Sequence, residues 1–230
     1  MRVGHCVQLA LETLEVARRH EGERRKVYGE AAMLHACNAV DGTASKRFGS
    51  KEPNAKRFTN IIREELLVFE HIGMPAIDLY RTRFPYKIKK QSSDGRSDIA
   101  DVLYHVHRCA HGHGDDVEEG FELQLCGGVA GNHSMRFTPD AVRLPESAIL
   151  GLAAIAVLAP ENADQRAWDA SIPWVGGTLS VNDWWGRKTD FLALAEQGGY
   201  NQYKLDMTPP ENVNAPLSEI VSSTLGRTLD

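Results

Sequence analysis

SDIADVLYHVHRCAHGHGDD, residues 97–116, is the stretch from which the fold and the chemistry of this chain are read. Its apolar residues recur at helical spacing, at Ile99, Val102, Leu103, Val106 and Ala110. Ser97 or Asp94 is expected to cap the start of this helix, and Gly112 with Gly114 is expected to end it. The pattern therefore predicts a helix over residues 97–110 that carries an arginine and several histidines to its C-terminal end.

The end of this helix concentrates side chains suited to acid–base chemistry. Four of the chain's nine histidines lie between residues 105 and 113, with Arg108 among them and Asp115 and Asp116 just after. On a straight α-helix Arg108 and His113 would stand about 140° apart, because each residue turns the helix by about 100°. A looser turn at Gly112 would bring His113 back beside Arg108. We therefore expect the functional site at this helix end.

The segment Arg108-Cys-Ala-His-Gly-His113 resembles the R-x4-6-H signature of the HEPN nucleotide-binding and ribonuclease domains. The residues that frame it are similar to those of the Apea-like branch of that family, and the resemblance covers about residues 23–116. It implies a helical bundle that works as a homodimer, cleaves RNA without a cofactor, and serves in cellular defence or as a toxin-type module with an antitoxin-type partner. Arg108, His111 and His113 are then the catalytic candidates. Cys109 departs from the family pattern, in which a polar residue such as Asn often follows the arginine.

The residue types fit metal-independent RNA cleavage. That reaction needs a base for the ribose 2′ proton, an acid for the leaving 5′ oxygen and a cation on the phosphate. Histidine titrates near neutral pH and can serve as base or acid. The planar fork of arginine matches the oxygens of the phosphate. His113 and Arg108 would therefore supply two of the three functions.

Two other interpretations of the same stretch remain open. One is a catalytically inactive HEPN-like protein that only binds nucleotides or RNA. The other is a metal site, since His107 and His111 are four residues apart and His113 is close behind. The side chains that could complete such a site, namely His105, Asp115 and Asp116, follow no established spacing, and the glutamate of an H-E-x-x-H motif is missing.

A basic and aromatic segment, residues 75–96, precedes the motif helix. Its cations and rings alternate in the way that single-stranded RNA paths use, with charge for the backbone and rings for the bases. A solvated surface loop is the competing interpretation. The RNA-binding candidates are Arg81, Arg83, Tyr86, Lys87, Lys89, Lys90 and Arg96. In the helix predicted over residues 23–48, His35 and Asp41 are polar positions for which a surface role is favoured, although a HEPN-like site could use either.

The composition is that of an ordinary globular chain. Its net charge of −5 excludes a global basic field for nucleic acid, so any such contact must be local. The four cysteines show no framework spacing and are interpreted as reduced thiols of a cytoplasmic protein. The longest uncharged apolar run, residues 148–159, is about half of what a membrane span needs, so no membrane association is expected.

The fold class predicted from these patterns is mainly α, a HEPN-like helical bundle with a small β appendage in the C-terminal half. Residues 1–116 would form the helical region, residues 117–206 would complete the same domain, and residues 207–230 would be a tail. Helices are expected over residues 5–20, 23–48, 54–69, 145–159 and 182–197. Strands are expected over residues 121–126, 135–144 and, as a hairpin, 172–181.

Overall fold

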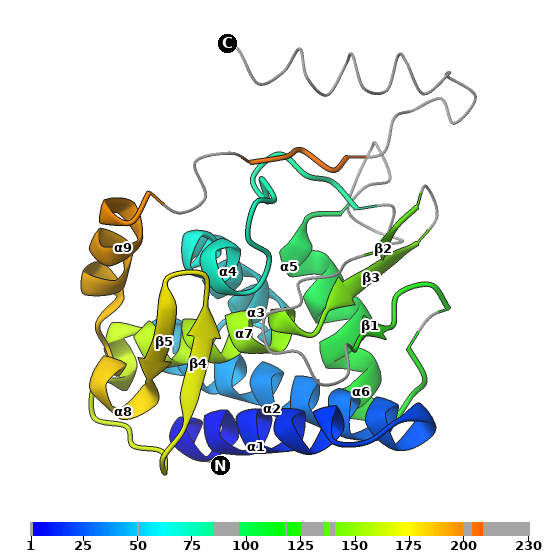
Figure 1. Cartoon of the computed structure of the whole chain (residues 1–230), viewed down its shortest axis with the longest axis horizontal. Helices are drawn as coiled ribbons and strands as arrows, with labels where there is room; N and C mark the ends of the chain where they lie inside the picture. Colours follow the sequence, from blue (N-terminus) through cyan, green and yellow to red (C-terminus); the bar gives the residue numbers. More distant parts are fainter. Residues whose placement is uncertain are drawn as a thin grey trace.

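Two long helices that lie side by side, α1 (Val3–Arg18) and α2 (Gly22–Phe48), form the base of the molecule (Figure 1). The computed structural model describes residues 2–49, 51–84, 97–117, 119–125, 136–138, 141–199 and 204–208. The two helices pack closely because their contact uses small residues. A Cβ atom at Gly42 would stand only 2.9 Å from Cγ2 of Val3. The prediction of a mainly α fold with a small β part is confirmed.

The core is organised around α7 (Ser147–Leu158), in which every residue is buried. It packs against α1, α2 and α4, which explains why its sequence is apolar on all sides rather than along one stripe. Among the described residues no helix is both long enough and apolar enough to cross a membrane.

The helix expected over residues 54–69 is instead two helices, α3 (Asn54–Glu64) and α4 (Leu66–Ile72). At the break, Glu65 leaves the helical region of backbone space, with φ −103° and ψ 17°. Its carboxylate is only 2% exposed and accepts from Arg47 at 2.6 Å and from Lys188 at 2.8 Å. We attribute the break to these ion pairs, which tie residue 65 to α2 and to the later helix α9 (Lys188–Gln197). Periodicity cannot reveal such contacts.

The β part consists of two small sheets. In the first, β3 (Val142–Pro145) pairs in parallel with β1 (Leu123–Gln124) and antiparallel with β2 (Arg136–Phe137). The second is the hairpin of β4 (Ser171–Trp174) and β5 (Gly177–Ser180). The helix expected over residues 182–197 is divided into α8 (Val181–Trp184) and α9 (Lys188–Gln197). The division falls at Gly186, whose φ of +76° is a conformation that glycine adopts readily.

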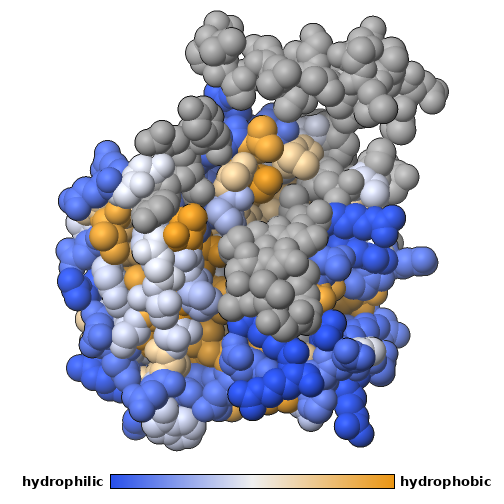
Figure 2. Space-filling model, in the orientation of Figure 1, coloured by the Kyte–Doolittle hydropathy of each residue, from blue (hydrophilic) through white to orange (hydrophobic). Residues whose placement is uncertain are grey.

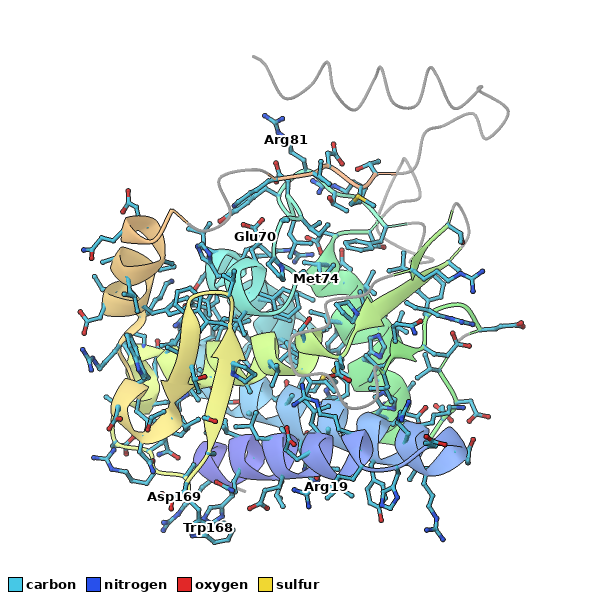
Figure 3. All side chains as sticks on the ribbon, viewed as in Figure 1. Arg19, Glu70, Met74, Arg81, Trp168 and Asp169 are labelled. Atoms are coloured by element: carbon cyan, nitrogen blue, oxygen red, sulfur yellow. The ribbon has the colours of Figure 1, made fainter. Side chains whose placement is uncertain are left out.

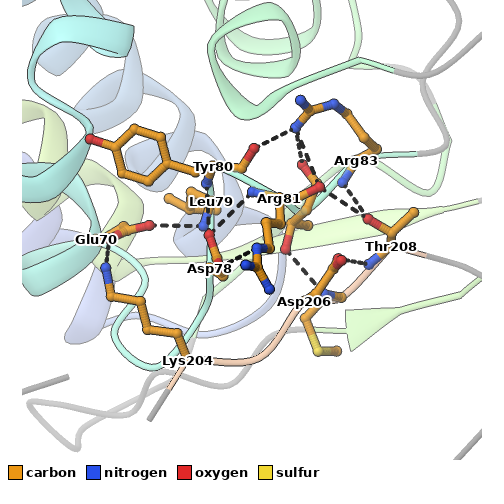
Figure 4. Close-up of polar contacts among 11 residues, drawn as sticks. Glu70, Asp78, Leu79, Tyr80, Arg81, Arg83, Lys204, Asp206 and Thr208 are labelled. Carbon is orange, nitrogen blue, oxygen red and sulfur yellow. Dashed lines mark hydrogen bonds and ion pairs between the residues drawn. The ribbon is translucent and has the colours of Figure 1, made fainter. Parts of the chain in front are cut away.

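Residues 204–208, which span the predicted boundary between the domain and the tail, form a strap across the loop after α4. Leu205 exchanges backbone hydrogen bonds with Ala76 and Asp78, each at 2.9 Å. Met207 and Thr208 bond to Thr82 and Arg83 farther along (Figure 4). Below the strap, the buried Glu70 accepts from the backbone of Leu79 at 2.8 Å and from Lys204. Burial raises the pKa of Glu70, and the bond from Lys204 opposes that rise.

Replacing Lys204 by Met should loosen this strap. Glu70 is 1% exposed and would lose its only described cationic partner, and a buried carboxylate without a charged partner is costly. Because Lys204 is itself partly exposed, we expect a loss of about 1–3 kcal/mol of stability in urea unfolding. Lys26→Met, which removes an exposed 3.9 Å pair with Glu30, is the control and should change stability by less than about 0.5 kcal/mol. Equal effects of the two variants would contradict the proposed anchoring.

Candidate functional site

The motif helix runs without interruption from residue 99 to residue 113, but its geometry changes along the way. It begins as α5 (Ile99–Val102), continues as the π-helical turn η1 (Leu103–Arg108) and ends as α6 (Cys109–His113). Asp98 caps its start by accepting from the backbone of Asp101 at 2.9 Å, so the prediction of Ser97 or Asp94 as the cap was wrong. Gly114, with φ +73°, ends it as predicted, but Gly112 does not, because α6 continues through it to His113, three residues past the predicted end at residue 110.

The π turn alters which side chains share a face. Its hydrogen bonds join residues five apart, as from the amide of Cys109 to the carbonyl of Tyr104. The wider turn rotates everything after it relative to a continuous α-helix. As a result His107 is fully buried, whereas Ala110, expected in the core, is only half-buried. Such turns are frequent at functional sites.

Arg108 is held from one side by an aspartate of α2. Its Nε donates to Oδ2 of Asp41 at 3.0 Å, and the two side chains are 22% and 21% exposed. The guanidinium also lies 5.7 Å from the centre of the Tyr104 ring. Within the described residues neither Nη1 nor Nη2 donates a hydrogen bond, and Nη1 lies 3.8 Å from where a Cβ of Gly112 would stand. The free edge of Arg108 therefore extends toward the helix end that carries His113.

The groups around this pair are partly shielded from water. Burial raises the pKa of Asp41, and the charge of Arg108 and its hydrogen bond oppose that rise. Burial also raises the pKa of Tyr104. Cys109 raises it further, whereas the charge of Arg108 lowers it. Cys37, one turn before Asp41, is fully buried, and its burial raises the pKa of its thiol. Tyr104 and Cys37 are therefore uncharged at neutral pH, and the Arg108–Asp41 pair is the charged centre.

The four histidines of the motif helix lie in different environments. His113 is exposed, and the described part of the chain gives it no hydrogen bond or ion pair. His107 and His111 face each other with ring centres 5.8 Å apart. Burial lowers the pKa of His107 to about 3, with the charge of His111 adding, and burial lowers that of His111 to about 4. Both are therefore neutral near pH 7. Of the three catalytic candidates, His113 stays open to solvent while His111 turns inward.

The metal interpretation finds little support in the described residues. No three His, Cys, Asp or Glu side chains among them are placed to hold a metal ion, so His107, His111 and His113 do not form a ligand set there. His105, which was considered as a further ligand, lies with its ring edge-on to that of Tyr104, and the two ring centres are 5.0 Å apart.

Of the predicted RNA-binding residues, two are described. Arg81 is exposed and pairs with Asp78 at 3.6 Å. Arg83 is largely used by its own loop, since Nη1 donates to the carbonyls of Tyr80, Arg81 and Thr82. Backbone bonds between Phe84 and Ser97 join the two ends of the following segment at the start of the motif helix. Outside the described residues lie Tyr86, Lys87, Lys89, Lys90 and Arg96.

Sequence reasoning named Asp41 only as a polar position that a site could use. It did not pair Asp41 with Arg108, because the two are 67 residues apart. Tyr104 lies in the stretch 97–116, but no function was predicted for it. The signal that could have pointed to Asp41 is that it is the only acidic residue in the second half of α2, after Glu30, where small residues predominate.

Comparison with known proteins places the chain among mycobacterial relatives. A family model named Rv1289 matches residues 16–210. Two proteins, "Uncharacterized protein Rv1289" of Mycobacterium tuberculosis and "Uncharacterized protein Mb1320" of Mycobacterium bovis, are each 39% identical over 173 residues. In both cases the match covers 74% of this chain and 80% of the relative. No solved structure matches.

Proposed function

The chain belongs to the Rv1289 family, and we propose that it is a HEPN-like endoribonuclease that cleaves RNA without a metal ion. The observation that carries the proposal is the position of Arg108. Asp41 holds its Nε, while within the described residues neither Nη group donates a hydrogen bond, at the helix end that carries an exposed histidine. A guanidinium whose Nε is held by a carboxylate is suited to bind a phosphate through its two Nη groups.

In the proposed reaction the ribose 2′-hydroxyl attacks the adjacent phosphorus. A base removes the 2′ proton, the P–O5′ bond breaks, and an acid protonates the leaving 5′ oxygen. The products are a 2′,3′-cyclic phosphate and a 5′-hydroxyl. Arg108 would stabilise the charge that develops on the phosphate oxygens, and His113 would act as base or acid. His111, neutral and turned toward His107, would support the helix end rather than transfer protons.

We further propose that the working unit is a homodimer. The reaction needs both a base and an acid, and His113 is the one exposed histidine of each motif helix. A second copy that brings its own helix end across a shared cleft would supply the other. RNA would reach the cleft along residues 75–96. The HEPN resemblance adds a toxin-type role with an antitoxin-type partner, and the cysteine pattern adds a cytoplasmic location.

The second candidate function is RNA or nucleotide binding without cleavage. The observation that favours it is the same ion pair, because Asp41 neutralises part of the charge that Arg108 would offer to a phosphate. Cys109 favours it as well, because it stands where HEPN domains often have a polar residue such as Asn. The two functions make the same prediction for binding and opposite predictions for cleavage.

The decisive experiment separates the purified protein by size with light scattering and incubates the dimer peak with single-stranded RNA. We expect cleavage that EDTA does not change, with products that end in 2′,3′-cyclic phosphate. A strictly monomeric protein would remove the argument for a shared site. RNA that is bound but never cut would replace the ribonuclease with the binding protein.

A further inference from the structure

A hollow of about 800 Å³ lies between the first turns of α1 and the segment 164–168, which follows the short 3-10 turn after α7. Figure 3 shows Trp168 and Asp169 at the lower edge of the molecule, beside the start of α1. Neither Arg108, Asp41 nor His113 lines this hollow. It is therefore distinct from the candidate active site. Its volume suits a ligand of the size of a nucleotide.

The two walls of the hollow are fastened together by glutamines. The backbone of Gly4 donates to the side chain of Gln165 at 3.2 Å, and the backbone of Trp168 donates to Oε1 of Gln8 at 2.8 Å. Gln8 is 4% exposed. A Cβ at Gly4 would stand 2.2 Å from the carbonyl oxygen of Arg166, so glycine is required for this close approach.

This fastening holds the backbone of Trp168 in place while its indole remains 72% exposed, the highest value among the large hydrophobic side chains described. Exposing an indole gives up the free energy that its burial would provide. A fixed backbone with an open ring is the arrangement of a stacking platform, since a flat ligand can cover the ring at little further cost in ordering.

The charges around the hollow are mainly cationic. Arg2 and Arg166 line it, against one carboxylate, that of Asp164. Nη1 of Arg166 donates to the carbonyl of Gln165 at 2.6 Å, so a ligand would bind to the rest of that guanidinium. That carboxylate has Lys46 at 3.6 Å, which offsets its charge. Figure 2 shows the lower edge of the molecule, where α1 lies, as mostly hydrophilic, so this is not an apolar docking face. Arginine beside an exposed aromatic ring suits a ligand with both an anionic group and a planar base.

From this geometry we propose that the hollow binds a nucleotide, with its base on Trp168 and its phosphate at Arg2 and Arg166. The ligand is a free nucleotide or the end of an RNA strand. An RNA strand that continues past this hollow is disfavoured, because the adjoining hollow of about 680 Å³ is lined by Glu12, Glu15 and Asp169. Those carboxylates would repel a continuing phosphate backbone, although Arg18 and Arg19 lie there too. The site does not require the protein to cleave RNA.

The test titrates the full-length protein with AMP and, in a separate arm, with a short 5′-phosphorylated single-stranded RNA. Intrinsic tryptophan fluorescence and calorimetry follow the binding. We expect quenching on saturation, with AMP bound more tightly than adenosine. Trp168→Ala should weaken binding about 5- to 150-fold, the range typical of one base–aromatic stack. Trp168→Phe should retain most of the affinity but lose the quenching, because the ring remains while the reporter is gone.

The controls separate this site from the proposed active site. Arg108→Lys should bind AMP as the wild type does, whatever its effect on cleavage. Tyr28→Ala, which removes an exposed ring stacked on His20 elsewhere on the surface, should not change affinity. Binding that Trp168→Ala leaves unchanged would overturn the inference, as would no binding of either probe at millimolar concentration. Quenching by an acidic peptide but not by nucleotides would overturn it too and assign the hollow to a protein partner.

Discussion

Replacing His113 by Ala, or Arg108 by Lys, is expected to abolish RNA cleavage while the protein stays folded. His113→Ala removes the proposed proton carrier, a contribution of about 10²–10⁴ in rate. Arg108→Lys keeps the positive charge, but a single ammonium cannot both bind Asp41 and present two parallel donors to a phosphate. His113 is exposed and Arg108 is partly exposed, so neither change creates a cavity in the core.

The measurement is the cleavage rate of a labelled single-stranded RNA at saturating concentration, with thermal unfolding as the check on folding. Arg63→Lys is the matched control, because Arg63 pairs with Asp98 and Asp101 at the opposite end of the same helix. Arg63→Lys should leave the rate within about twofold of the wild type, because Arg63 contacts no proposed catalytic group and the conservative change should preserve the fold. A further variant, Cys109→Asn, should cleave RNA at the wild-type rate or faster. Wild-type cleavage by His113→Ala would refute the assignment of that residue.

A second large effect is expected in the pH dependence of stability. Burial lowers the pKa of His107 to about 3 in the folded protein, whereas an unfolded chain would bind the proton near pH 6.5. Below pH 6.5 the unfolded state therefore binds more protons, and stability is lost as the pH falls. At pH 4.5, still above the folded pKa, this one residue should cost about 2.5–3 kcal/mol relative to neutral pH.

Replacing His107 by Leu removes that contribution. Urea unfolding from pH 7 to pH 4.5 should show a smaller loss for the variant than for the wild type. At pH 7 the variant should be as stable or more stable, since within the described residues neither ring nitrogen of His107 has a hydrogen-bond partner. Val106→Ala, a change at a buried neighbour with no titratable group, should lower stability by the same amount at every pH. Parallel pH curves for wild type and His107→Leu would show that His107 is not held neutral.

Other histidines and acids that are at least partly buried make this comparison necessary. Burial lowers the pKa of His111 to about 4 and lowers those of His35 and His71 too, which adds to the loss at low pH. Burial raises the pKa of Asp41 and Glu70, which acts in the opposite direction because their protonation in the folded state is favoured. Only the difference between the wild type and the variant isolates His107.

The sequence alone determined the features that depend on local periodicity and on turn residues. The helical spacing up to Val106 was enough to place the motif helix, and Gly114 marked its end, although the helix continues through Gly112, which was also expected to end it. The continuous apolar run at residues 148–159 is typical of a helix with no polar face, and every residue of α7 is buried. These features follow from side chains within a few turns of one another, where backbone geometry leaves little freedom.

The tertiary structure alone decided which groups meet at the site. The spacing argument assumes 3.6 residues per turn, so it could not predict the π turn or the burial of His107 that comes with it. The pairing of Arg108 with Asp41, the break at Glu65 and the fastening of Trp168 to Gln8 join residues of different elements. Such contacts form only when packing of the core brings distant parts of the chain together, and no local pattern encodes their partners.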